Sequence, residues 1–125
     1  MNIIFDSEVA QKLKEKYTVL ELDTVMQPKM TEPLTLYAVV ETVNISEIST
    51  LPFFKEMHEE MIKAYKGGDW DKATGLAQSL RGQFGGELNE FYDLVIDFCR
   101  ESAKVNLQWD GVKHTVPVEG QILDD

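Results

Sequence analysis

Two histidines are the residues of this chain whose chemistry could most readily support catalysis or metal binding. His58 lies at helical spacing with apolar residues and is followed directly by Glu59 and Glu60. An imidazole close to carboxylates can bind a metal ion or transfer a proton. Because both glutamates fall off the apolar face, we interpret His58 as a core or boundary residue. His114 is expected in a strand opposite Leu107, with no second histidine or cysteine nearby, which makes a functional role still weaker.

A pair of carboxylates, Glu21 and Asp23, lies two residues apart in an extended segment. Side chains at this spacing share one face of a strand, and paired carboxylates can divide the acid and base roles of a reaction. The pattern supplies no cation or metal ligand to accompany them. We therefore interpret both residues as solvent-facing or edge-strand charges that protect the strand from pairing with other chains, and we expect no catalysis there.

The most distinctive surface is a stripe of carboxylates on a helix expected to begin near residue 87. At 100° per residue they fall within about 120° of arc opposite the apolar face, and at 1.5 Å per residue they extend over about 20 Å. The stripe contains Glu87, Glu90, Asp93, Asp97 and Glu101. Like charges at this spacing disfavour a helix by a few tenths of a kcal/mol per pair. The stripe is therefore a candidate binding surface for a basic partner, and a solvated helix face is the alternative.

The sequence lacks the short motifs that accompany phosphate, nucleotide or zinc chemistry. It contains no P-loop, no G-x-G-x-x-G, no H-E-x-x-H and no G-x-S-x-G. The single cysteine, Cys99, excludes an internal disulfide and a cysteine-based zinc site, and we expect it in the core. We predict no enzyme, no cofactor and no metal ion. A small metal-dependent hydrolase centred on His58 with Glu59 or Glu60 is the least favoured alternative.

The elements that must position these residues begin with a short helix and two strands. Asp6 or Ser7 can cap a helix of about three turns. Alternation over residues 18–25 predicts a half-buried strand, and the more apolar residues 34–41 predict a central strand. The intervening residues 27–33 contain two prolines and predict a loop.

From residue 51 to 104 the apolar spacing becomes helical. A first helix is expected to end at Gly67-Gly68, and Asp69 is expected to cap a second. Residues 54–82 resemble one helical hairpin of a tetratricopeptide repeat, in which an aromatic residue ends the first helix and Gly-Asp-aromatic-x-x-Ala starts the second. The pattern occurs once, so the resemblance implies only the geometry of a helical hairpin and no repeat array.

The C-terminal segment predicts a β-hairpin. Asp110-Gly111 separates two alternating runs, 105–109 and 112–116, which favours a two-residue turn. One face of this hairpin is almost wholly apolar and must be covered by helices or by a partner. Trp109 on that face is a further candidate protein-binding residue, and a homodimer formed through it is left open.

Composition bounds the class of protein. The chain has 125 residues, of which 43% are hydrophobic, and no apolar run is long enough to span a membrane. Its net charge of −10 repels phosphate, which argues against direct binding to nucleic acid or anionic membranes. We expect one α+β domain over residues 1–118, in which an antiparallel sheet of about four strands packs against three or four helices and a C-terminal β-hairpin. Residues 119–125 are expected to form a mobile acidic tail.

Three segments resemble small uncharacterised acidic proteins of tailed phages that infect marine cyanobacteria. These segments are KYTVLELDT at 16–24, YAVVE at 37–41 and GGELNEFY at 85–92. The resemblance extends over about residues 1–95 and brings no known activity or functional residues. It implies synthesis in the cytoplasm of an infected bacterial cell, where small acidic phage proteins often bind and redirect a host protein.

We therefore expect a non-enzymatic protein that binds a host or phage protein through the acidic stripe and Trp109. The alternative is an acidic nucleic-acid mimic that inhibits a host nucleic-acid enzyme through the same carboxylates. The two hypotheses differ in the class of partner and in how steeply binding weakens with salt.

Overall fold

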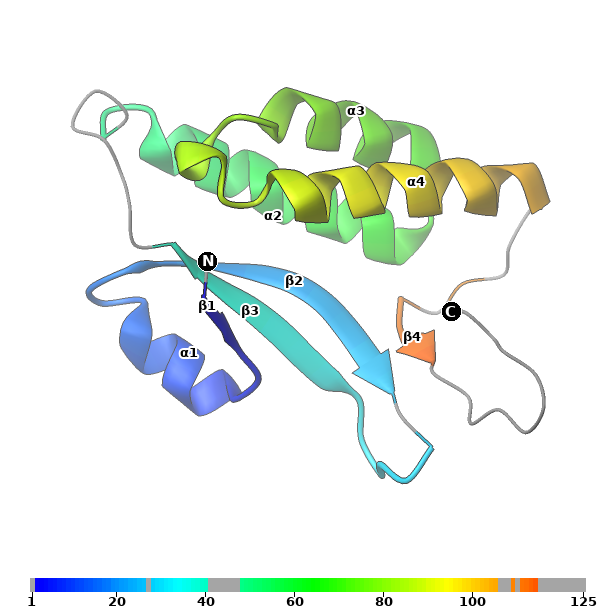
Figure 1. Ribbon diagram of the computed structural model, residues 1–125, viewed down its shortest axis with the longest axis horizontal. Helices are drawn as coiled ribbons and strands as arrows, with labels where there is room; N and C mark the ends of the chain where they lie inside the picture. Colours follow the sequence, from blue (N-terminus) through cyan, green and yellow to red (C-terminus); the bar gives the residue numbers. More distant parts are fainter. Residues whose placement is uncertain (1, 27, 41–47, 106–108, 110, 115–125) are drawn as a thin grey trace.

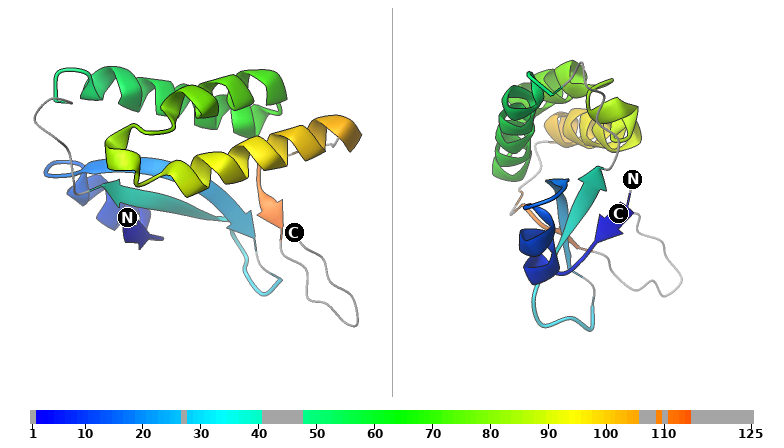
Figure 2. Two further views of the ribbon diagram at one scale, coloured as in Figure 1. Left: turned by 45° about the horizontal axis from the view of Figure 1, so that its top comes forward. Right: turned by 90° about the vertical axis from the view of Figure 1, so that its left-hand side faces the viewer.

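An antiparallel sheet has helices on both of its faces. The computed structural model describes residues 2–26, 28–40, 48–105, 109 and 111–114. Within these residues, three helices cover one face of the sheet and a fourth, shorter helix lies on the opposite face (Figure 1). The end-on view in Figure 2 shows the same two-sided arrangement. The predicted α+β class is confirmed.

The described residues contain three antiparallel strands. In spatial order they are β1 (Asn2–Ile4), β3 (Leu34–Val40) and β2 (Thr18–Met26). The more apolar strand, β3, is therefore central, as its composition predicts. A two-residue strand, β4 (Lys113–His114), pairs in parallel with the end of β2.

The pairing of β2 with β3 contains one extra residue on β2. Glu21 lies opposite Tyr37, and Thr24 lies opposite Thr35, so two residues of β2 stand opposite one residue of β3 between these pairs. Such a bulge interrupts the alternation of side chains between the two faces of a sheet. The side chain of Asp23, inside the bulge, therefore need not share the face of Glu21.

The helix bounds follow the capping signals in the sequence. The helices are α1 (Ser7–Leu13), α2 (Leu51–Gly67), α3 (Trp70–Leu80) and α4 (Asn89–Val105). The Asp6 side chain accepts hydrogen bonds from backbone N–H groups in the first turn of α1, and Asp69 caps α3 in the same way. Gly68 takes a φ of +80° where α2 ends. α1 is shorter than expected, and α4 begins two residues after Glu87.

Between α3 and α4 the chain makes a short left-handed turn, η2 (Phe84–Gly86). Phe84 has a φ of 55°, and the two glycines that follow it have φ values of 69° and 76°. A non-glycine residue in this region is strained by on the order of 1–2 kcal/mol. The phenyl ring of Phe84 is only 3% exposed, so its burial in the core offsets the strain.

The main hydrophobic core lies between the sheet and the three helices α2, α3 and α4. Its largest fully buried side chains are Tyr65, Tyr92, Met61, Leu80 and Leu88. A smaller cluster of Ala10, Val19 and Val39 fills the space between the sheet and α1. Each face of β2 and β3 therefore has its own apolar layer, and α2 and α4 are held against the face that carries Leu20 and Leu22.

The predicted C-terminal β-hairpin is not shown. Val105 ends α4 instead of starting a strand, because the helix continues through Ala103 and Lys104, both good helix formers. Most of the expected hairpin partners, at 106–108, 110, 115 and 116, lie outside the described residues, as does the predicted tail at 119–125. The short strand that is described, β4, pairs with β2 in parallel.

Candidate functional site

The outward side of α4 carries four of the five carboxylates predicted from the sequence, together with an exposed leucine. Leu94 is 62% exposed, and Glu90 and Asp97 lie four residues before it and three residues after it. Residues at these spacings are neighbours on a helix surface. We call this surface the α4 outer face; its members are Glu90, Asp93, Leu94, Asp97 and Glu101, all exposed. The fifth predicted carboxylate, Glu87, precedes the helix and is half-buried.

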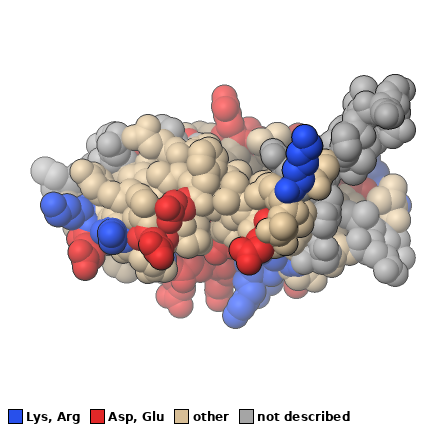
Figure 3. Space-filling model, turned by 90° about the horizontal axis from the view of Figure 1, so that it is seen from below, with Lys and Arg blue, Asp and Glu red and all other residues tan. Residues whose placement is uncertain are grey.

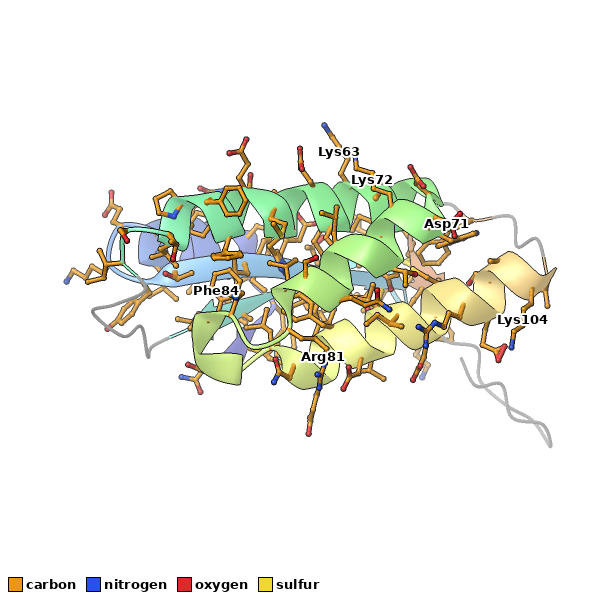
Figure 4. The ribbon with its side chains drawn as sticks, turned by 90° about the horizontal axis from the view of Figure 1, so that it is seen from above. Lys63, Asp71, Lys72, Arg81, Phe84 and Lys104 are labelled. Carbon is orange, nitrogen blue, oxygen red and sulfur yellow. The ribbon has the colours of Figure 1, made fainter. Side chains whose placement is uncertain are left out.

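Two carboxylates of the α4 outer face are paired with basic residues of the same chain. Arg81, at the end of α3, donates from Nε and Nη2 to the two oxygens of Asp93 at 2.7 and 3.3 Å. Lys104 lies 3.8 Å from Glu101, with both side chains 72% exposed. Figure 4 labels Arg81, directly after α3, and Lys104, on α4. Among the described residues, Glu90 and Asp97 have no basic group within ion-pair distance, so the charge beside Leu94 is left uncompensated.

His58 is a core residue, as its position on the apolar face of α2 predicts. Its side chain is fully buried, its Nδ1 lies 2.8 Å from the Tyr92 hydroxyl, and its Nε2 lies 2.6 Å from the Glu21 carbonyl oxygen. A carbonyl only accepts, so Nε2 carries the proton and Nδ1 accepts from Tyr92. Burial lowers the pKa of His58 to about 4, which keeps the ring neutral. Both Glu59 and Glu60 are exposed, and they are not partners of this ring.

Glu21 and Asp23 lie on a strand whose outer side pairs, among the described residues, with the two-residue β4 alone, but the expectation that they have no cation partner is wrong. Lys66 of α2 donates to the Glu21 carboxylate and to the Thr24 hydroxyl, the latter at 2.7 Å. The Tyr65 hydroxyl donates to Asp23 at 2.8 Å. The bulge in β2 explains the contact of Asp23 with the helices, since it breaks the alternation that would have turned this carboxylate away.

Trp109 lies in contact with the helices and not on the α4 outer face. Its indole Nε1 donates to the Tyr65 carbonyl oxygen at 2.7 Å, and its ring centroid is 4.9 Å from that of Phe98. Trp70 of α3 is a further ring neighbour at 6.1 Å. Trp109 and the carboxylates, which were predicted to bind a partner together, therefore lie on different surfaces. Phe98, which contacts Trp109, is one helical turn from Leu94 on α4. We call the described residues Trp109 and 111–114 the strap.

The strap places a lysine on an aromatic surface. The Lys113 ammonium lies 3.1 Å from the Asp23 carboxylate, 4.8 Å from the ring centroid of Phe98 and 5.7 Å from that of Tyr65. Burial and the neighbouring Asp23 raise the pKa of Tyr65 far above its ordinary value, so its hydroxyl stays protonated and continues to donate. Asp23, Tyr65 and Phe98 together form what we call the ammonium seat. Sequence analysis missed it because its parts come from β2, α2 and α4.

Cys99 is buried in the core, as predicted. Burial raises the pKa of its thiol to about 11, so the reactive thiolate is not populated at neutral pH. Above it, a shallow hollow lies between α3 and α4, lined among others by Gly75, Arg100 and Lys104. No group of three or more histidine, cysteine or acidic side chains among the described residues could hold a metal ion.

The face of the sheet that carries α1 has a different character. Viewed from this side, uncharged residues cover much of the surface, with acidic and basic groups between them (Figure 3). Four large apolar side chains from the first 17 residues are more than 40% exposed: Ile3, Phe5, Val9 and Tyr17. The sequence places the predicted homodimer at the apolar face of the C-terminal hairpin, most of which lies outside the described residues, and it stays a prediction.

Comparisons with known proteins give no relative. No protein-family model matches the chain, and neither a curated protein nor a solved structure is significantly similar to it. In the part of the chain that the structure describes, no helix is both long enough and apolar enough to cross a membrane.

Proposed function

We propose that this protein is a non-enzymatic interaction protein of phage type that binds a basic protein partner in the bacterial cytoplasm through the α4 outer face. The observation that carries the proposal is the exposure of Leu94, at 62%, between the uncompensated carboxylates of Glu90 and Asp97. A single exposed leucine is ordinary on a protein surface. An apolar side chain flanked by carboxylates, however, is consistent with an interface that has an apolar centre and a polar rim.

The charge of the chain favours a basic partner. A net charge of −10 attracts positively charged proteins at long range, and the carboxylates beside Leu94 concentrate this attraction at one surface. Leu94 would then enter an apolar pocket of the partner and set the rate of dissociation, while the carboxylates set the rate of association. Binding should therefore have one component that salt weakens and another that salt leaves unchanged.

The same surface is less suited to mimic a nucleic acid. Arg81 holds Asp93 with two hydrogen bonds, and Lys104 lies beside Glu101, so this chain's own cations compensate two of its four exposed carboxylates. A surface that replaces phosphates would instead keep its charges free and would not need an apolar residue at its centre. A protein partner is therefore the better-supported function.

The experiment begins with capture of a partner from bacterial lysate by the tagged protein, followed by affinity measurements with the purified partner at 50 and 500 mM salt. We expect Glu90→Gln with Asp97→Asn to weaken binding at least fivefold at low salt and much less at high salt. Leu94→Ala should weaken binding at both salt concentrations. The matched control is Glu59→Gln with Glu60→Gln, which removes the same charge from exposed positions on α2.

Three results would reject the proposal. Equal weakening by the α2 control would show that net charge, rather than the α4 outer face, drives binding. Unchanged affinity in the Leu94→Ala variant would show that Leu94 is not the apolar centre of the interface. The third result is a partner that is a nucleic-acid enzyme, releases its nucleic acid when it binds this protein, and binds Leu94→Ala as tightly as the wild type. In that case the nucleic-acid mimic hypothesis replaces the present one.

A further inference from the structure

Three separate elements converge on one ammonium group at the ammonium seat. The Lys113 Nζ lies 3.1 Å from Asp23 Oδ2 on β2, 4.8 Å from the ring of Phe98 on α4, and 5.7 Å from the ring of Tyr65 on α2. A carboxylate combined with aromatic faces is the environment that recognises alkylammonium groups in proteins. This geometry is independent of the α4 outer face and of the function proposed for it.

The seat is ordered by contacts that do not involve the strap. The Tyr65 hydroxyl donates to Asp23 Oδ1 at 2.8 Å, which leaves Oδ2 directed at the ammonium. The rings of Tyr65 and Phe98 pack edge to face with centroids 5.6 Å apart. Asp23 is only 14% exposed, so without Lys113 it would be a poorly solvated negative charge against aromatic rings. An empty seat would therefore favour the entry of another cation.

The strap holds the outer side of β2 and packs against the helices through Trp109, whose ring neighbours are Tyr65, Trp70 and Phe98. Among the described residues its backbone pairs with β2 at Val25↔Lys113 and Met26↔His114. The indole of Trp109 adds one hydrogen bond, and the Lys113 side chain remains 28% exposed. Since β4 is the edge strand of the described sheet, release of the strap would leave the pairing of β1, β3 and β2 intact, while it would expose the surface of the helices that Trp109 covers.

We propose that Asp23, Tyr65 and Phe98 form a binding site for a lysine side chain of another protein, which the strap occupies in cis. The ligand is a segment with an aromatic residue followed four positions later by a lysine, as in Trp109 and Lys113. In this arrangement the strap is an intramolecular competitor that lowers the apparent affinity for the external segment.

The test uses a fluorescently labelled peptide with the sequence of residues 105–116, VNLQWDGVKHTV, and full-length protein in which Trp109→Ala and Lys113→Ala remove the competitor. Fluorescence anisotropy at 150 mM salt gives the dissociation constants. We expect the peptide to bind this variant at least tenfold more tightly than it binds the wild type, a difference of about 1.4 kcal/mol. Adding Asp23→Asn should reverse at least half of this gain, on a logarithmic scale.

A peptide with alanine in place of its tryptophan and lysine is the control, and it should not bind. Equal binding of both peptides, or equal affinity of the wild type and the double variant, would overturn the proposal. Thermal melts establish whether the double variant is folded. If it is not, Lys113→Met decides, because it keeps Trp109 and the apolar stem of the lysine while removing the charge. This variant should bind the peptide at least threefold more tightly than the wild type, and no gain would overturn the proposal.

Discussion

The buried imidazole of His58 makes the stability of this protein depend on pH in a defined window. The unfolded chain binds a proton at this residue with a pKa near 6.5, whereas burial lowers the pKa in the folded state to about 4. Below pH 6.5 the unfolded state therefore binds more protons than the folded state, and stability falls as the pH falls. The stabilising contribution is complete above pH 6.5 and is lost as the pH approaches 4. The difference between the two pKa values corresponds to about 3 kcal/mol.

Urea unfolding at several pH values measures this loss, with the fluorescence of Trp70 and Trp109 as the signal. Between pH 6 and 4.5 the wild type should lose about 1.1 kcal/mol per pH unit through this residue. His58→Gln replaces the ring with an amide, which can form hydrogen bonds but does not titrate. The difference in stability between wild type and variant should therefore shrink as the pH falls. This subtraction removes the contribution of carboxylates, which is common to both proteins.

Two results would refute the reasoning about His58. One is an identical dependence of stability on pH in the wild type and in His58→Gln. The other is an NMR titration of the His58 ring with a midpoint near 6.5, which would show that the imidazole is solvated in the folded state. A midpoint near 4 in the same titration would show directly that burial lowers the pKa of His58.

Three further substitutions test individual contacts by chemical or thermal unfolding. Tyr92→Phe removes the hydroxyl that donates to His58 and should destabilise the fold by about 1–2 kcal/mol; a neutral effect would show that the hydrogen bond makes no net contribution. Gly75→Ala should stabilise α3 by about 0.5–1 kcal/mol, since an added Cβ meets nothing within 4 Å, and destabilisation would contradict this. Gly111→Ala should loosen the strap, because its φ is +84° and its Cβ would lie 3.2 Å from the Lys66 carbonyl; unchanged emission from Trp109 would argue against that close approach.

The parts of the fold that the sequence predicts are those governed by neighbours in the chain. Asp69 caps α3 because its side chain reaches an N–H three residues later, and Gly68 ends α2 because glycine adopts a positive φ without strain. Alternation likewise locates β2 and β3. Each of these signals operates over a few residues, so no knowledge of tertiary contacts is needed to read it.

The contacts that sequence analysis missed depend on residues far apart. Asp23 meets Tyr65 and Lys113 only because a bulge interrupts β2 and because β4 lies beside it, and neither event leaves a local signal. Val105 shows a different limit. A single β-branched residue fits a strand or the last turn of a helix, and the local run around it is too short for its period to distinguish them.

The pairing of β4 with β2 also bears on the order in which the protein is assembled. Val25 and Lys113 are 88 residues apart, so closing this loop carries a larger entropic cost than the local contacts within α2, α3 and α4. During synthesis, β2 and α2 are made before residue 113. A nascent chain that has folded this far therefore presents Asp23 and Tyr65 without Lys113. In the proposed scheme, the seat is complete once Phe98 has been made, and it is open to competing segments until Lys113 follows.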